Sequence, residues 1–323
     1  MRRFLRGIFQ IILVLIAIVV LVVAYFATRD YGDDFRERHG TFQSVQTDST
    51  EVDTLVTRSW VTLRSTSGLQ VGCGVVVPNQ PAETPTRKYP AIIVLGGKAT
   101  GKNAVRYAFN IDDVVIVSPD YAYEPRRTYS VTAFLGDLPE IHGAILDMVP
   151  SVMLALDYLE RRGDVDMSKV VMMGYSFGAP FVPVIMANDA RPAVAAMVYG
   201  GGDMESLIRH NVGRYEGPFV ADLVGKLSGV LLQPLEPLRH VGKISPRPLL
   251  MINGTDDEQV PRANAEMLYE GAGQPKKIVW LESKHVNPRN IALTMKILQT
   301  LRAELVALGI VRSGLPPMPV MAR

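Results

Sequence analysis

Residues 170–180 read VVMMGYSFGAP, an apolar run that stops at a serine standing between two glycines. A continuous apolar run of this length is typical of a strand that is buried on both faces. Gly174, Ser176 and Gly178 also match G-x-S-x-G, the pattern of a nucleophile elbow, in which a tight strand-to-helix turn exposes a serine hydroxyl. Three fixed positions filled by common residues fit an ordinary small-residue turn as well. The stretch therefore predicts a buried strand and leaves the role of Ser176 to the rest of the chain.

The composition excludes several classes of protein. The chain has 323 residues, and 34 basic against 32 acidic side chains give a net charge of +2. This balance offers no electrostatic footprint for nucleic acid, so we expect no nucleic-acid partner. Cys73 is the single cysteine, which excludes an intramolecular disulfide and a cysteine-rich metal site. Its surroundings, QVGCGVVV, predict a small buried strand residue.

The amino terminus carries a long apolar segment. Residues 7–28 contain no charge, and Gln10 is their one strongly polar side chain. Twenty helical residues span roughly 30 Å, which is the thickness of the hydrocarbon core of a bilayer. We therefore expect residues 1–28 to form a transmembrane anchor. A cleaved signal peptide is the alternative, because Arg2, Arg3 and Arg6 form a basic start, although the apolar core is long for one.

The orientation of this anchor is finely balanced. Arg29, Arg36 and Arg38 after the segment equal in number the three arginines before it. The tighter clustering at the amino terminus, together with its free amino group, favours a cytoplasmic amino terminus. The sequence thus predicts a single-pass membrane protein whose main domain lies on the extracytoplasmic side.

The rest of the chain divides into three parts. Residues 29–55 are polar and lack a sustained helical period, which predicts a stalk between membrane and domain. Residues 59–78 predict a β-hairpin around Thr66-Ser67-Gly68 and open the main domain, which we place at 56–312. Residues 313–323 are rich in proline and predict a frayed tail.

Within 56–312, apolar runs alternate with helical patterns. This alternation predicts an α/β fold with a mostly parallel sheet and helices on both faces. The runs that predict strands of this sheet are AIIVLGG (91–97), VVIVSPDY (114–121), AVAAMVYGG (193–201), RPLLMING (247–254) and KKIVWLES (276–283).

Three reactive residue types follow these runs in chain order. Ser176 follows VVMMGY, Asp257 follows LLMINGTD, and His285 follows VWLESK. In an open parallel sheet, ligands bind beyond the carboxyl ends of the strands. A serine hydroxyl becomes a nucleophile when a histidine accepts its proton, and a carboxylate then orients the imidazole. Of the five histidines, only His285 lies after the candidate acid at a strand end, which predicts Ser176, Asp257 and His285 as a catalytic triad.

Two parts of this site stay open at the level of residues. Asp256 and Glu258 flank Asp257, and Glu282 lies near His285, so each is an alternative acid. For the oxyanion, the backbone N–H of Phe177 is one expected donor. We expect the second from Gly97 or Lys98, where glycines permit close backbone approach, although Gly96-Gly97 also fits a plain tight turn.

The chain resembles the α/β-hydrolase superfamily, and within it the dienelactone-hydrolase and acetyl-esterase-like branches. The resemblance rests on YPAIIVLGG, LDYLERRGDVDMSKVVMMGYSFGA, ISPRPLLMINGTDDEQVP and VWLESKHVNP, together with the hairpin LRSTSGLQVGCGVVVP. It implies Ser176 as nucleophile, His285 as general base, and Asp257 as orienting acid through the D-x-x-V-P ending. Leu95 stands where many members have histidine. A serine in place of the cysteine of dienelactone hydrolases implies an ester, thioester or amide substrate.

Two segments near the site carry further expectations. Residues 203–246 are longer than a minimal crossover, and predict either a lid lining an acyl pocket through apolar residues or a packed crossover helix. The lining residues would be Phe219, Leu223, Leu227 and Leu231. Pro183 is expected to distort the helix at 178–188.

The sequence as a whole predicts a membrane-anchored serine hydrolase that cleaves a carboxylic ester or related acyl bond through an acyl-enzyme. We expect no metal and no organic cofactor. A peptidase, acyltransferase or thioesterase on the same fold is the alternative. A non-catalytic binding module is disfavoured, because all three triad residue types occur at strand ends. Pocket shape, which the sequence does not reveal, sets the substrate, and the oligomeric state is open.

Overall fold

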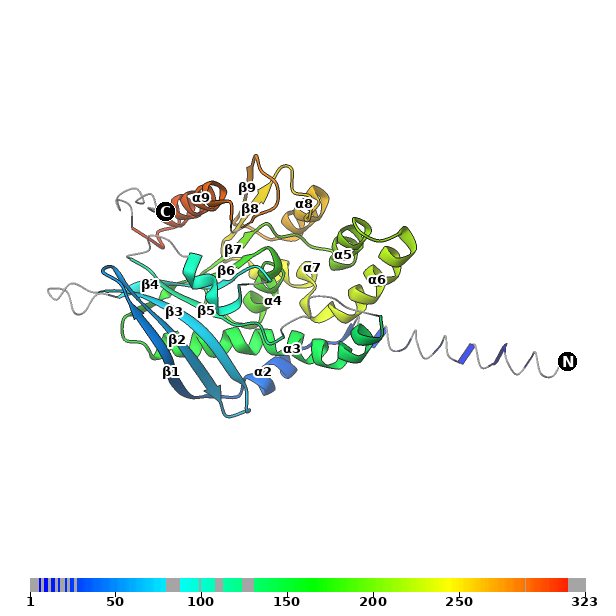
Figure 1. Ribbon diagram of the computed structural model, residues 1–323, viewed down its shortest axis with the longest axis horizontal. Coiled ribbons are helices and arrows are strands. Elements are labelled where there is room, and N and C mark those ends of the chain that lie inside the picture. Colours follow the sequence, from blue (N-terminus) through cyan, green and yellow to red (C-terminus); the bar gives the residue numbers. More distant parts are fainter. Residues whose placement is uncertain are drawn as a thin grey trace.

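The protein is described from a computed structural model. It covers residues 28–79, 88–98, 100–107, 113–123, 131–287 and 289–312, together with isolated helical positions between Arg6 and Tyr25. Among these residues nine strands form one sheet (Figure 1). The strands are β1 Phe42–Val52, β2 Val56–Ser65, β3 Gln70–Pro78, β4 Tyr89–Leu95, β5 Val115–Pro119, β6 Val165–Tyr175, β7 Val194–Val198, β8 Leu249–Gly254 and β9 Lys276–Leu281. The helices are α2 Gly32–His39, α3 Val131–Arg161, α4 Phe181–Asn188, α5 Met204–Gly213, α6 Pro218–Leu231, α7 Pro237–His240, α8 Arg262–Gly271 and α9 Ile291–Ala307.

The strand order is β1-β2-β3-β5-β4-β6-β7-β8-β9. β1, β2, β3 and β5 pair antiparallel in turn, and the remaining pairs, from β5–β4 to β8–β9, are parallel. This is the α/β-hydrolase arrangement, and it confirms the predicted mostly parallel sheet led by a hairpin.

Helices cover both faces of the sheet (Figure 1). Neighbouring residues of β4 point to opposite sides, since Ile93 packs in the core with α3 and α4, while Ile92 packs in the core with α9. Every residue of β7 and β8 is buried. A strand covered on both faces needs apolar side chains at every position, which explains the unbroken apolar runs in the sequence. Cys73 lies fully buried on β3, as predicted.

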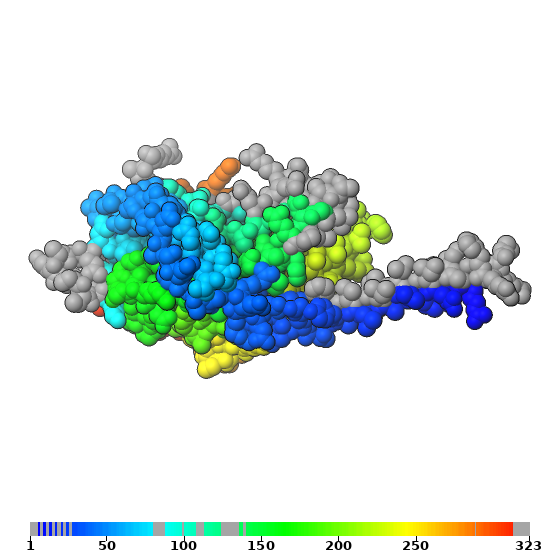
Figure 2. Space-filling view, turned by 90° about the horizontal axis from the view of Figure 1, so that it is seen from below, coloured from blue at the N-terminus to red at the C-terminus, as the bar shows by residue number. Residues whose placement is uncertain are grey.

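The expected polar stalk at 29–55 is wrong. This segment folds into α2 and β1, and both belong to the domain. Tyr31 and Phe35 are 5% and 1% exposed in the main core. Figure 2 shows the blue residues of this segment lying against the green α3. The domain therefore begins about 25 residues earlier than its predicted start at residue 56.

Polar contacts secure the misassigned segment to α3. Arg38 forms an ion pair with Asp147 at 2.6 Å, and the His39 imidazole lies 2.9 Å from the Asp157 carboxylate. β1 pairs antiparallel with β2 along its length. Almost all of β1 is exposed on both faces. A strand without a buried face has no apolar alternation, so its pattern could not be told from a stalk.

The expected transmembrane anchor at 1–28 lies mostly outside the described residues, as does the tail at 313–323. In the described part of the chain, one helical stretch is long and apolar enough to cross a bilayer, Glu140–Arg161 within α3. Of its most apolar window, 61% is buried inside the protein. That stretch is a core helix packed against the sheet.

The helix after Ser176 begins later than the sequence pattern predicted. Ser176–Gly178 form a single 3-10 turn, and α4 starts at Phe181. Pro183 consequently falls in the first turn of α4, where backbone N–H groups have no partner inside the helix. The predicted distortion by Pro183 is therefore not needed, because a proline in the first turn removes no helical hydrogen bond.

Candidate active site

The sheet brings the three predicted triad residues together at its carboxyl edge. Ser176 follows β6, Asp257 lies in the loop after β8, and His285 lies in the loop after β9. The Ser176 hydroxyl oxygen is 2.7 Å from His285 Nε2. Both carboxylate oxygens of Asp257 lie within 2.9 Å of His285 Nδ1. Residues 109 and 28 positions apart in the chain thus form one hydrogen-bonded line.

The elbow is a strained turn that only small neighbours permit. Ser176 has φ of 49°, a left-handed conformation that costs energy for any residue with a side chain. A Cβ on Gly174 would lie within 3.0 Å of the Gly178 carbonyl, and one on Gly178 would lie as close to the Leu95 carbonyl. The two glycines of the pattern therefore let the turn close on itself and rest against the end of β4.

The carboxylate of Asp257 is held from two sides. Its Oδ1 accepts the backbone N–H groups of Gln259 at 2.8 Å and Val260 at 3.0 Å. The Asp257 side chain is 1% exposed and that of His285 is 6% exposed. Because a carboxylate only accepts hydrogen bonds, His285 Nδ1 carries a proton and Nε2 is free to accept one from Ser176. Asp256 is exposed and does not contact the imidazole.

Glu258, an alternative acid in the sequence, has a different place. Its Oε2 accepts the backbone N–H of His285 at 3.1 Å. Hydrogen bonds from its own backbone N–H and from that of His285 lower the pKa of Glu258 below its usual value. The carboxylate therefore stays charged and ties the acid loop to the histidine loop. Glu282, the remaining alternative, is exposed.

Tyr199 was not predicted from the sequence as a site residue, and its ring packs against the imidazole of His285. This residue follows β7, is fully buried, and has φ of 57°. Its ring stands edge-on to the His285 ring, and its hydroxyl forms a hydrogen bond with the Ser283 hydroxyl. Burial raises the pKa of Tyr199 above its ordinary value, so the phenol keeps its proton. The Tyr-Gly-Gly that ends the β7 run was the available signal.

The loop that should supply a second oxyanion donor lies beside the elbow. Because Gly178 packs on Leu95, the residues after β4 are next to Phe177. The Gly97 carbonyl accepts the backbone N–H and the hydroxyl of Thr100 at 2.9 and 2.7 Å, which closes a turn over Lys98. This turn leaves the Gly97 carbonyl occupied while Lys98 is exposed. Gly97 and Lys98 thus follow a strand end that packs on the elbow, and the role of Gly97, Lys98 and Phe177 as donors stays a prediction.

Tyr121, which was also not predicted from the sequence, contacts both the turn after β4 and Phe177. Its hydroxyl donates to the Gly96 carbonyl, and its ring packs edge-on against Phe177 with centroids 5.0 Å apart. Burial raises the pKa of the Tyr121 hydroxyl far above its usual value. The neutral phenol therefore holds the 96–98 turn by a donated hydrogen bond.

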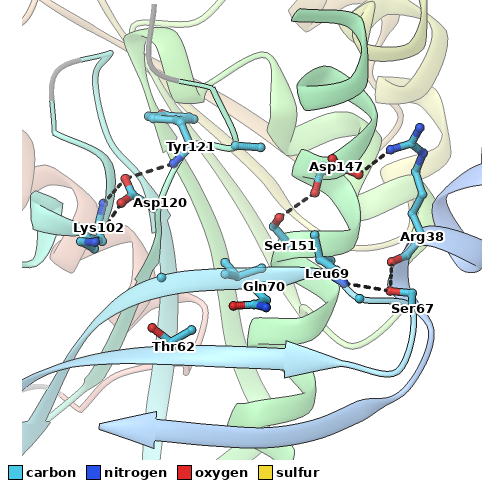
Figure 3. A pocket seen from close by; sticks show the side chains of 14 residues that line it. Arg38, Thr62, Ser67, Leu69, Gln70, Lys102, Asp120, Tyr121, Asp147 and Ser151 are labelled. Carbon is cyan, nitrogen blue, oxygen red and sulfur yellow. Dashed lines mark hydrogen bonds and ion pairs between the residues drawn. The ribbon is translucent and has the colours of Figure 1, made fainter. Parts of the chain in front are cut away.

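A polar hollow of about 710 Å³ has Tyr121 as one of its lining residues (Figure 3). Its charged groups are paired, Lys102 with Asp120 at 3.2 Å and Arg38 with Asp147 at 2.6 Å. No triad residue lines it. Tyr121 therefore separates this hollow from the elbow.

The segment 203–246 folds into a helical hairpin, α5 and α6, followed by short turns and α7. Two of the residues expected to line an acyl pocket, Phe219 and Leu223, are 81% and 56% exposed and face outward. The hairpin is joined to the acid loop through α5: His210 Nε2 lies 3.0 Å from the Glu258 carbonyl, and Asn211 donates to the Gln259 carbonyl at 2.7 Å. These contacts come from the last turn of α5, so the end of the hairpin near the 214–217 turn borders the acid loop.

Comparison with known families agrees with this geometry. The model of the prolyl oligopeptidase family matches residues 147–277, a stretch that includes Ser176 and Asp257. The uncharacterized protein YfhR of Salmonella typhi is 26% identical over 135 residues, which cover 41% of this chain and 46% of that protein. The α/β-hydrolase domain-containing protein WAV2 of Arabidopsis thaliana is 26% identical over 130 residues, 39% of this chain and 42% of that protein. The chain thus matches less than half the length of these relatives.

Solved structures share the fold over most of the chain. An acetyl xylan esterase from Paenibacillus sp. R4 superposes with a TM-score of 0.63 at 16% identity, covering 84% of this chain and 93% of the esterase. Acetyl xylan esterase 1 from Thermoanaerobacterium sp. JW/SL YS485 superposes with a TM-score of 0.62 at 14% identity, covering 88% and 97%. Together with the family match, the sheet order and the elbow, these likenesses confirm the resemblance to the α/β-hydrolase superfamily found in the sequence: the chain has the fold of that superfamily and the arrangement of a serine hydrolase.

Proposed function

We propose that the protein is a membrane-anchored serine hydrolase that cleaves carboxylic esters through an acyl-enzyme. The observation that carries the proposal is the line from Ser176 through His285 to Asp257, with contacts of 2.7 and 2.8 Å. A nucleophile, a base and an orienting acid within hydrogen-bond reach of each other are the requirement for this chemistry.

The first half-reaction forms the acyl-enzyme. Ser176 Oγ attacks the carbonyl carbon of the ester, and its proton passes to His285 Nε2. Asp257 stabilises the resulting imidazolium through Nδ1–H. The carbonyl oxygen becomes an oxyanion, which the N–H of Phe177 and that of Gly97 or Lys98 bind. The bond to the leaving alcohol then breaks, and the alcohol oxygen takes the proton from His285.

The second half-reaction restores the enzyme. Water attacks the acyl carbon while its proton passes to His285 Nε2, and the same donors bind the second oxyanion. The bond to Ser176 Oγ breaks, Oγ regains the proton from His285, and the carboxylic acid leaves. The cycle consumes one water and needs no other reactant.

One observation favours an ester over other acyl substrates. Solved structures that share the fold include acetyl xylan esterases and a cold-adapted esterase. Ser176, rather than a cysteine, stands at the elbow, which is compatible with an ester, a thioester or an amide. The match to the prolyl oligopeptidase family supports a peptidase as the second candidate.

Membrane anchoring rests on residues 7–28, which are uncharged and long enough to span a bilayer. The clustered Arg2, Arg3 and Arg6 support a cytoplasmic amino terminus and an extracytoplasmic catalytic domain. Protease added to intact cells is expected to digest the domain, and protection of the domain would reverse the orientation.

Labelling with a fluorophosphonate probe tests the catalytic proposal. The full chain in detergent is expected to label at Ser176, and S176A is expected not to label. S168A, which removes an exposed serine on the same strand, is the matched control and should label like the native chain. Equal weak labelling of the native chain and S176A would rule out the serine hydrolase.

The substrate class is tested on the same preparation. p-Nitrophenyl esters of increasing acyl length are compared with prolyl p-nitroanilide. Turnover of the esters, abolished in S176A, is expected. Faster turnover of the anilide would favour the peptidase.

A further inference from the structure

The outer face of the α5–α6 hairpin is apolar and exposed. Tyr215 in the connecting turn and Phe219 at the start of α6 are each 81% exposed. Leu223, one helical turn after Phe219, is 56% exposed, and Val220 is 41% exposed. Side chains four residues apart lie on one side of a helix, so Phe219 and Leu223 form a continuous stripe next to Tyr215.

The inner face of α6 is built from small residues. Ala221 and Gly225 are buried, and a Cβ on Gly225 would come within 3.0 Å of the Arg209 side chain on α5. These residues let the two helices pack closely. A surface helix of a water-soluble domain normally turns its large apolar side chains inward. In the first half of α6, Phe219, Val220 and Leu223 face outward instead, and an exposed apolar face of this kind marks an interaction site.

The base of the hairpin touches the end of the apolar amino-terminal segment. Arg239 donates from Nη1 to Gln233 Oε1, just after α6, at 2.8 Å. From Nη2 it donates to the Arg29 carbonyl at 3.2 Å. Arg29 is the first charged residue after the uncharged stretch 7–28. One guanidinium therefore joins the hairpin to the point where the proposed anchor ends.

That junction is firm. Arg29 pairs with Asp34 at 2.5 Å, and Tyr31 and Phe35 are buried in the core. Residues 29–35 are consequently a fixed part of the domain. In Figure 1 the α5–α6 hairpin lies on the same side of the domain as the residues that directly precede α2, so the proposed anchor would place the hairpin on the bilayer side of the domain.

We propose that Tyr215, Phe219, Val220 and Leu223 form a docking face that inserts into the lipid surface beside the anchor. The inference rests on the proposed membrane anchoring and is independent of the catalytic proposal. Aromatic rings and arginines are the side chains that bilayer interfaces favour, and the Arg214 guanidinium lies 5.6 Å from the centre of the Tyr215 ring. A lipid surface is the expected occupant because the segment that follows α6 is joined through Arg239 to Arg29, where the proposed anchor ends.

Quenching by brominated lipids tests the docking face. The full chain carrying F219W is reconstituted into vesicles of phosphatidylcholine and phosphatidylglycerol, with bromine in the upper half of the acyl chains. The native chain supplies the background of Trp60 and Trp280. Insertion to a depth of about 5–10 Å is expected to remove roughly half or more of the added emission.

V52W is the matched control, since Val52 is a 77% exposed apolar residue at the end of β1, away from the hairpin. Its added emission should be unaffected by bromine. Flotation of both variants with the vesicles, and unchanged circular dichroism, show that anchor and fold are intact. Equal quenching of the two variants would overturn the docking face. Protection of F219W from acrylamide without quenching by bromine would also overturn it, because a protein surface would then cover the face. If the chain does not float with the vesicles, both the membrane anchor and the docking face are excluded. Fluorophosphonate labelling would still test the catalytic triad.

Discussion

The ring of Tyr199 stands edge-on to the ring of His285, with centroids 5.5 Å apart and planes at 84°. The Tyr199 hydroxyl also holds Ser283, two residues before His285, so one side chain positions the imidazole and its loop. The left-handed backbone of Tyr199, with φ of 57°, aims the ring at this spot. Strain kept in a buried residue beside reacting groups is typical of a site whose geometry matters.

Replacement of Tyr199 by phenylalanine is expected to lower kcat about 2- to 10-fold with little change in KM, because one positioning hydrogen bond is lost while the ring remains. S283A removes the same bond from its other end. Steady-state kinetics of both single variants and the double variant measure the coupling. The two effects should not add; full additivity would contradict the shared role.

The variant D257N is expected to lower kcat by about 10³- to 10⁴-fold, because an amide no longer fixes the proton of the imidazole on Nδ1. The variant D256N changes an exposed neighbour and should stay within about twofold of the native rate. Hydrolysis of p-nitrophenyl acetate distinguishes them. A larger loss in D256N would make Asp256 the orienting acid.

A Cβ on Gly178 would collide with the backbone of Leu95, so G178A is expected to cost about 1–3 kcal/mol of folding free energy and most of the activity. G143A supplies the comparison, since Gly143 lies within α3 with open space around it and should gain about 0.5–1 kcal/mol. Thermal melts of both variants give the sign. A neutral G178A would mean that the elbow is not tightly packed on β4.

Burial lowers the pKa of His240 to about 4, and its Nε2 lies 3.1 Å from the Pro234 carbonyl. An unfolded histidine titrates near pH 6.5, so the unfolded chain binds the extra proton first as the pH falls. Stability is therefore full above about pH 6.5 and declines toward pH 4. H240Q keeps a donor near the Pro234 carbonyl without titrating, so its melting temperature should fall less over this window. Parallel curves for the two proteins would exclude His240 as a cause.

Most of the sheet could be predicted from sequence because β4, β7, β8 and residues 170–174 of β6 are almost entirely buried and therefore almost entirely apolar. Residues 29–55 could not, since β1 has no buried face and α2 contributes little to the core beyond Phe35. Tyr31 and Phe35 are buried within a polar stretch, and two apolar positions are too few to show a helical or strand period. The domain start was misplaced for this reason.

The candidate site divides along similar lines. Ser176, Asp257 and His285 follow apolar runs, and strand ends in a parallel sheet share one edge, so their meeting could be expected from chain order. The parts played by Tyr199 and Tyr121 depend on a backbone angle and on ring packing across the sheet. Such features come from tertiary contacts and leave no local pattern. In the sequence Glu258 was an alternative orienting acid. In the structure it accepts the backbone N–H of His285 instead, and these two roles cannot be distinguished from the sequence.

The firm junction at Tyr31 and Phe35 limits how far the active site can travel. A free chain over residues 29–55 could have extended to about 90 Å, so that Ser176 could sample a deep layer of solution. With the segment folded into the domain, an anchored enzyme keeps its nucleophile within roughly 40 Å of the bilayer, about two domain radii. Such an enzyme would meet substrates that reside at or diffuse along the membrane at a rate that depends on their density per unit area of lipid.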